Sequence, residues 1–154
     1  MTDKRVFEVV LTGGPCSGKT TAKPWLAKYF GERGFKVLFV PEVATMLIDG
    51  GLEDIGELDA ETYTTVQNSL FDIQGALRNN YLKIAEKFDK PVIVVYDRAE
   101  GDIRTYIDDA IWQDILRQRD TSFVEITHSY DLVIHLVSAA VGAVEFYTTD
   151  NNTA

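Results

Sequence analysis

The sequence has one cysteine among its 154 residues, so no disulfide can form within the chain. This scarcity is typical of a reducing compartment, and we expect a cytoplasmic protein. No apolar run approaches the roughly 20 residues that cross a membrane, and the first ten residues, MTDKRVFEVV, lack the apolar segment and cleavage site of a signal peptide. The composition is that of an ordinary globular protein, and we expect residues 1–154 to form a single domain.

Basic residues are also scarce, with 15 Lys and Arg against 24 Asp and Glu and a net charge of −9. The imbalance is uneven: residues 1–40 carry seven bases and three acids, while residues 41–154 carry eight bases and 21 acids. Wide nucleic-acid binding requires a basic face, so the acidic body predicts no nucleic-acid partner. A small phosphate ligand held by one loop in the basic part stays compatible with this distribution.

Apolar and β-branched runs alternate with segments of helical periodicity. Residues 49–61, with six acids and no base, are expected to form an exposed loop. The alternation predicts an α/β fold of three layers, with helices on both faces of a mostly parallel sheet. The expected strands are residues 5–12, 36–40, 91–96 and 131–137, and the expected helices are residues 20–34, 62–88 and 103–119.

The stretch TGGPCSGKTT at residues 12–21 satisfies the spacing G-x-x-x-x-G-K-[ST]. In a chain of this length such a match arises by chance in about one sequence in 200. Its context, after a strand and before a helix, is the one in which a glycine-rich loop cradles phosphates with backbone N–H groups and a helix N-terminus. The predicted cofactor-binding residues are Gly13, Gly14, Pro15, Cys16, Ser17, Gly18, Lys19, Thr20 and Thr21.

The chemistry of phosphate and Mg²⁺ binding explains the polar residues in this loop. Lys19 supplies a mobile positive charge for the outer phosphates, the Thr20 hydroxyl is suited to Mg²⁺, and Thr21 is expected to donate to the inner phosphate. Cys16 is either a reactive thiolate, because Lys19 and a helix start are close in sequence, or simply a small residue that fits a tight loop.

Pro24 falls in the second turn of the expected helix, where it removes a backbone hydrogen bond. Either the helix bends at this residue or its first turn is irregular.

The apolar run VIVVY is followed directly by Asp97 and Arg98. A loop of this kind needs a carboxylate near the end of a neighbouring strand to help position Mg²⁺, and Asp97 is the candidate. The alternative is a helix cap. Arg98 could clamp phosphate oxygens or stabilise transferring charge; the alternative is an ion pair with Glu100 or Asp102.

Glu42 follows the strand at residues 36–40. Ligands of open α/β sheets gather at the carboxyl ends of the strands, and a carboxylate there could accept the proton of an attacking hydroxyl. The alternative is a surface acid at a helix start. The candidate catalytic residues are therefore Lys19, Glu42, Asp97 and Arg98, and the candidate metal ligands are Thr20 and Asp97.

Four segments together point to one group of P-loop proteins: VVLTGGPCSGKTTA, KVLFVPEVAT, VVYDR and YDLVIHLVSAA. With them the chain resembles the P-loop ATPase or kinase-like domain shared by NadR-type ribosylnicotinamide kinases and the TRPL-translocation-defect proteins. The resemblance implies a P-loop NTPase fold with the Asp97 strand beside the Gly13 strand, and Mg²⁺-dependent binding of ATP or GTP. It also implies a fifth strand beyond residue 154, so we expect the domain to be incomplete at its C-terminus and weaker in turnover than an extended version. Ala99 stands where the group usually has glycine.

Two functions follow from this resemblance. The first is a phosphotransferase that moves the outer phosphoryl group of a nucleoside triphosphate to a small hydroxyl acceptor such as a nucleoside. The alternative is a nucleotide-dependent switch or scaffold with slow hydrolysis and a protein or phosphoinositide partner.

Overall fold

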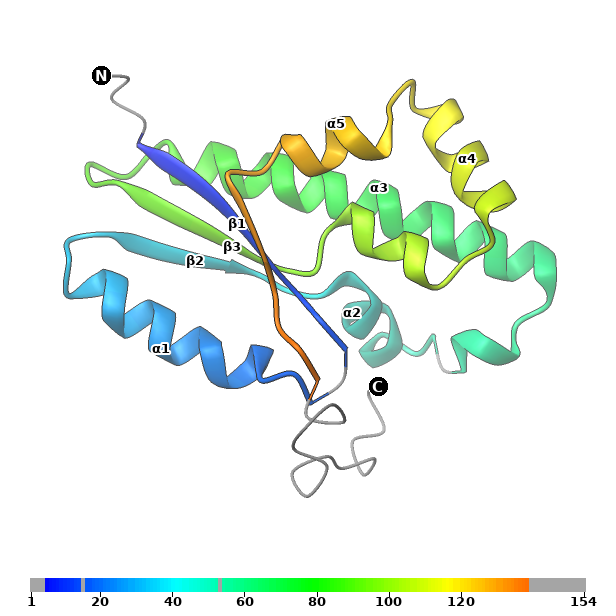
Figure 1. The fold of residues 1–154 in the computed structure, drawn as a ribbon, viewed down its shortest axis with the longest axis horizontal. Helices are drawn as coiled ribbons and strands as arrows, with labels where there is room; N and C mark the ends of the chain where they lie inside the picture. The colour runs from blue at the N-terminus through cyan, green and yellow to red at the C-terminus, as the bar shows by residue number, and fades with distance from the viewer. Residues whose placement is uncertain (1–4, 15, 53, 139–154) are drawn as a thin grey trace.

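The computed structural model describes residues 5–14, 16–52 and 54–138. They form four strands, five α-helices and two short 3₁₀ helices, arranged as an α/β fold (Figure 1). In chain order the elements are β1 (Val6–Thr12), α1 (Lys19–Gly31), β2 (Lys36–Val40), α2 (Val43–Asp49), η1 (Ile55–Glu57), α3 (Ala60–Ala85), β3 (Val92–Asp97), η2 (Glu100–Thr105), α4 (Asp109–Gln118), α5 (Phe123–His128) and β4 (Leu132–His135).

The sheet has the strand order β2-β3-β1-β4, and every described pair is parallel. The predicted α/β class and parallel sheet are therefore confirmed, as is the placement of the Asp97 strand beside the Gly13 strand. In the register of this pair Leu11 lies opposite Asp97. The carboxyl ends of β1, β2 and β3 consequently meet at one edge, where the residues that follow them gather.

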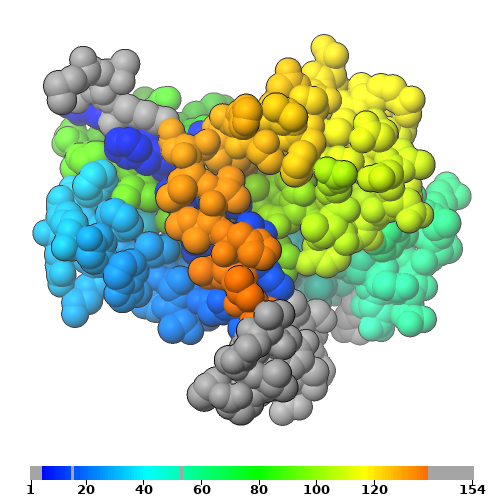
Figure 2. Space-filling model, in the orientation of Figure 1, coloured from blue at the N-terminus to red at the C-terminus, as the bar shows by residue number. Residues whose placement is uncertain are grey.

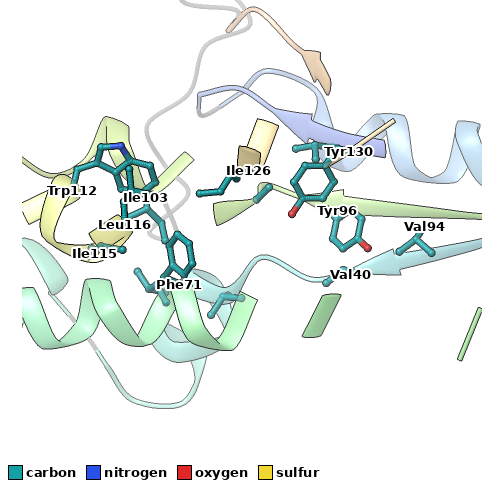
Figure 3. Packing of buried hydrophobic residues seen from close by; sticks show 14 of the residues in the cluster. Val40, Phe71, Val94, Tyr96, Ile103, Trp112, Ile115, Leu116, Ile126 and Tyr130 are labelled. Atoms are coloured by element: carbon teal, nitrogen blue, oxygen red, sulfur yellow. The ribbon is translucent and has the colours of Figure 1, made fainter. Parts of the chain in front are cut away.

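The two faces of the sheet carry separate apolar clusters, which makes three layers. Leu26 and Phe30 of α1 pack on the face that presents Leu11, Ile93 and Val95. On the other face α3, η2, α4 and α5 cover the alternate residues of the same strands. Figure 3 shows Tyr96 and Tyr130 beside each other here, with Phe71 and Trp112 further along the same cluster.

A buried polar group ties α3 to the start of β1. The guanidinium of Arg78 donates to both carboxylate oxygens of Glu8, at 2.7 and 3.0 Å, and the Tyr96 hydroxyl donates to the same carboxylate at 2.8 Å. Burial and the contact with Glu8 raise the pKa of Tyr96, because ionisation would add a second negative charge in a poorly solvated place. These hydrogen bonds link the long helix α3 to β1 and β3.

Two expectations about helices need correction. The helix expected over residues 103–119 is broken, because η2 ends at Thr105 and α4 begins only after Asp108, whose backbone is extended. Tyr106, the residue after η2, is 54% exposed. Helices α2 and α5 were not expected, although Ser122 and Glu125 form the sequence pattern of a capping box, and the Ser122 hydroxyl does accept from the Glu125 N–H.

The helix after the glycine-rich loop is continuous through Pro24. Its aromatic residues divide between two surfaces. Phe30 faces the sheet, whereas Trp25 is 60% exposed and stacks on Tyr29. The last strand in the described part of the chain, β4, lies at the surface (Figure 2), and its residues Leu132 and Val133 are about half exposed. No described helix is long and apolar enough to cross a membrane.

Candidate functional site

The glycine-rich loop joins β1 to α1 with a backbone that ordinary residues rarely adopt. Gly13 and Gly18 have φ values of +144° and +87°, and Cys16 is also left-handed at +54°. A Cβ on Gly13 would lie 2.3 Å from the carbonyl oxygen of Leu136. Gly13 is therefore required both by its backbone angle and by the close approach of the chain after β4. Pro15 lies outside the described residues.

Gly18 occupies the N-cap position of α1, which therefore begins at Lys19, as the motif predicts. The Lys19 side chain folds back on the loop, and its Nζ donates to the carbonyls of Gly13 at 2.8 Å and Gly14 at 3.3 Å. Thr20 and Thr21 stand exposed in the first turn of the helix. The buried Ser17 hydroxyl has no hydrogen-bond partner among the described residues. An unused donor and a helix N-terminus make this loop suited to an anion.

The electrostatic setting of Lys19 shows which residues gather around it. Burial lowers the pKa of Lys19, and the nearby Arg98 lowers it further, while Asp97, Glu42 and Asp102 oppose this by raising it. Glu42 follows β2, Asp97 and Arg98 stand together at the end of β3, and Asp102 lies in η2. Three of them were singled out from the sequence as Glu42, Asp97 and Arg98, so the fold brings together candidates that are up to 79 residues from Lys19 in the chain.

Asp97 ends β3 and is 7% exposed. Its Oδ2 atom lies 2.5 Å from the Nζ of Lys23, which is one turn after Lys19 on α1. Its Oδ1 atom is buried and has no hydrogen-bond partner among the described residues. Asp97 does not cap a helix: the next helix, η2, has Ala99 at its N-cap. No sequence pattern pairs Lys23 with this acid, because the ion pair depends on how α1 crosses β3.

Arg98 and Glu42 form an ion pair across the carboxyl edge of the sheet. The Nε of Arg98 lies 2.6 Å from Oε1 of Glu42, and the other Glu42 oxygen accepts from the Thr45 hydroxyl at 3.1 Å. Arg98 has a left-handed φ of +67°, and its Nη1 donates to the Tyr106 hydroxyl at 2.5 Å. The partner of Arg98 is thus Glu42, and not Glu100 or Asp102 as considered from the sequence.

Those two acids have other roles. The Asp102 carboxylate accepts from the Thr12 hydroxyl and from the Ala99 N–H, the latter at 2.9 Å. It thereby links the last residue of β1 to the turn after Arg98. The buried Glu100 carboxylate accepts from the Tyr130 hydroxyl. Both contacts hold the turn that carries Arg98 against the sheet.

Side chains from α3 complete this edge. Gln74 is 4% exposed, and its Nε2 donates to the carbonyl of Arg98 at 3.4 Å. Gln67 is equally buried, two turns earlier on the helix. The sequence offered one usable signal for these residues, namely two glutamines seven positions apart, each next to a residue of the apolar stripe, Val66 and Ile73.

The residues present fit a Mg²⁺ ion that is shared with a bound phosphate. Asp97 offers a buried carboxylate oxygen without a partner, and Thr20 offers a hydroxyl at the helix start. Within the described ranges no three His, Cys, Asp or Glu side chains group as a metal site of their own. Mg²⁺ usually keeps several waters and takes one or two protein ligands beside substrate phosphates, so a sparse donor set of this kind suits it.

Comparisons with known proteins identify a family and a similar solved structure. The chain is similar to a deoxyadenosine kinase from M. mycoides, solved with bound dATP, at 18% identity and a TM-score of 0.42, over 91% of this chain and 69% of that one. No curated protein matches. A family model described as an AAA domain matches residues 8–153. Since that match takes in almost the whole chain, from β1 through the glycine-rich loop to beyond β4, the protein belongs to this AAA domain family.

Proposed function

We propose that this protein binds a nucleoside triphosphate with Mg²⁺ and transfers its outer phosphoryl group to a small hydroxyl acceptor such as a nucleoside. The observation that carries the proposal is the 2.6 Å ion pair between Glu42 and Arg98. It places a carboxylate and a guanidinium from two different strand ends beside the lysine of the phosphate loop. A loop that only binds nucleotide needs neither group at that position.

The phosphate end of the reaction rests on residues 13–21. The backbone N–H groups of the loop and the N-terminus of α1 would hold the phosphates, and Lys19 would exchange its bonds to the Gly13 and Gly14 carbonyls for phosphate oxygens. Thr20 and Asp97 would hold Mg²⁺, which supplies positive charge to the triphosphate when bound. The nucleotide is ATP or GTP.

The acceptor end rests on Glu42. Its carboxylate would accept the proton of the attacking hydroxyl, and Arg98 orients it through the ion pair while Thr45 holds the second oxygen. Arg98 also brings positive charge toward the phosphoryl group in transfer. The buried amide of Gln74 supports the Arg98 backbone from α3. The narrower likeness to NadR-type kinases supports a nucleoside-like acceptor.

The first test is nucleotide binding. ATP and GTP are titrated with Mg²⁺ against the wild type, Lys19→Ala and, as a matched control, Lys28→Ala, which changes an exposed lysine of the same helix. We expect Lys19→Ala to weaken binding by about 10- to 100-fold, the contribution of charge-assisted hydrogen bonds, and Lys28→Ala to bind as the wild type does. Equal affinity of Lys19→Ala and wild type would refute the phosphate site.

The second test is transfer. Nucleosides are screened as acceptors with the bound triphosphate, and the rate is compared between wild type, Glu42→Gln and Thr45→Val. Loss of a general base lowers the rate by about 10²- to 10⁴-fold, so Glu42→Gln should lose transfer while it keeps triphosphate affinity, and Thr45→Val should lose little. An unchanged rate in Glu42→Gln would exclude Glu42 as the base. Triphosphate binding without transfer to any acceptor would favour the nucleotide-dependent switch.

A further inference from the structure

The ion pair between Lys23 and Asp97 places a second lysine at the end of β3. Lys23 lies one helical turn after Lys19 on α1, and its Nζ is 2.5 Å from Oδ2 of Asp97. The two side chains are 28% and 10% exposed, so the contact is largely shielded from solvent. Attraction between opposite charges is stronger in such a place than at the surface.

The Asp97 carboxylate is only half satisfied by this contact. Its Oδ1 atom is buried and has no hydrogen-bond partner among residues 5–14, 16–52 and 54–138. A buried carboxylate without compensating charge is strongly unfavourable. Lys23 is the cation in direct contact with Asp97, and Lys19 adds a second positive charge nearby.

We propose that Lys23 is an internal cation that competes with Mg²⁺ for Asp97, and that this competition makes metal binding depend on the nucleotide. The inference rests on the metal role of Asp97 in the proposed function. Lys23 and Mg²⁺ repel each other when both lie against one carboxylate. Mg²⁺ alone must displace Lys23 without compensation, and so it binds weakly.

A nucleotide changes this balance because it brings its own negative charge. When Mg²⁺ arrives with a triphosphate, the phosphate oxygens can accept the Lys23 ammonium as it leaves Asp97. Metal and nucleotide then bind as a pair, and the site is protected from occupation by metal without substrate. Lys23 is in this sense a positioning and specificity residue, and it takes no part in proton transfer.

The competition is measured with metal alone. The full chain without nucleotide is titrated with Mn²⁺, and free Mn²⁺ is followed by electron paramagnetic resonance in wild type, Lys23→Met, Lys23→Arg and Lys28→Met. Removal of one nearby positive charge should tighten Mn²⁺ binding by about tenfold or more in Lys23→Met. Lys23→Arg keeps the charge and should remain close to the wild type, as should Lys28→Met on the exposed side of the helix.

Asp97→Asn separates this inference from the proposed function. We expect Asp97→Asn to lose Mn²⁺ binding, and the double variant Lys23→Met/Asp97→Asn to behave as Asp97→Asn does. If Asp97→Asn loses Mn²⁺ but Lys23→Met binds as the wild type does, the competition is wrong and the metal role of Asp97 survives. If Asp97→Asn binds Mn²⁺ unchanged, that metal role fails. Thermal unfolding checks each variant, and Lys23→Gln is judged by the same criterion should Lys23→Met not fold.

Discussion

Gly13 shows at the scale of one residue why the phosphate loop tolerates so little change. Its φ of +144° is rarely adopted by L side chains, and a Cβ would lie 2.3 Å from the Leu136 carbonyl oxygen. We expect Gly13→Ala to lower the free energy of unfolding by about 2–4 kcal/mol through backbone strain and overpacking, and to lose nucleotide binding. Urea denaturation measures the first effect and titration the second.

Gly31 provides the matched control for this substitution. It lies in α1, its φ is not positive, and a Cβ would meet nothing within 4 Å. Gly31→Ala should therefore be neutral or stabilising by about 0.5–1 kcal/mol. Equal stability of Gly13→Ala and Gly31→Ala would show that the chain after β4 does not press on the loop.

Single residues also show which parts of the site could be predicted from the sequence. Gly18 and Lys19 stand where the motif places them, because their spacing encodes a local backbone path. The partners of Asp97 and Arg98 could not be derived in this way. Lys23 is 74 residues from Asp97, and Glu42 is 56 residues from Arg98. Such pairs depend on the crossing of elements, which periodicity and propensity leave open.

At the scale of the element, α1 is unusual because it continues through Pro24. Proline lacks the N–H that would donate to the Thr20 carbonyl, and its ring crowds that carbonyl. Since the preceding bond, from Ala22 N–H to the Gly18 carbonyl at 2.9 Å, is intact, the defect is local. We expect Pro24→Ala to raise the free energy of unfolding by about 1–3 kcal/mol. Urea denaturation measures this change, and the dependence of the unfolding free energy on urea concentration should stay the same in both proteins.

Ala27→Gly on the exposed part of the same helix is the reference for propensity alone. It should cost about 1 kcal/mol. If Pro24→Ala has no effect while Ala27→Gly costs the usual amount, the first turns of α1 already avoid the strain that Pro24 introduces.

The elements themselves were predicted best where tertiary contacts agree with local preference. All four strands were expected close to their observed bounds, because each is a short run of mainly apolar and β-branched residues. The break between η2 and α4 was missed because Ile103 and Ile107 keep helical spacing across it. At the break itself the Tyr106 carbonyl accepts from the Tyr63 hydroxyl of α3 at 2.6 Å, a contact that the apolar pattern does not encode.

For the whole molecule, the phosphate loop lies where β1 meets both β3 and β4. The Arg98 N–H donates to the Leu11 carbonyl and the Leu136 N–H to the Thr12 carbonyl, each at 2.9 Å. A ligand held by this loop binds only the folded arrangement and so stabilises it by mass action. At a concentration 100 times the dissociation constant the gain is about 2.7 kcal/mol, which for a chain of this size raises the melting temperature by about 5–10 °C.

Scanning calorimetry of the full chain with Mg²⁺ and ATP or GTP measures this shift. Lys19→Ala should lose most of it at the same ligand concentration, because its occupancy falls, whereas Lys28→Ala should keep it. A shift of equal size in Lys19→Ala would mean that the ligand stabilises the fold from another surface. The same scans with Mg²⁺ alone should give almost no shift in the wild type if Lys23, which lies 2.5 Å from Asp97, competes with the metal as proposed.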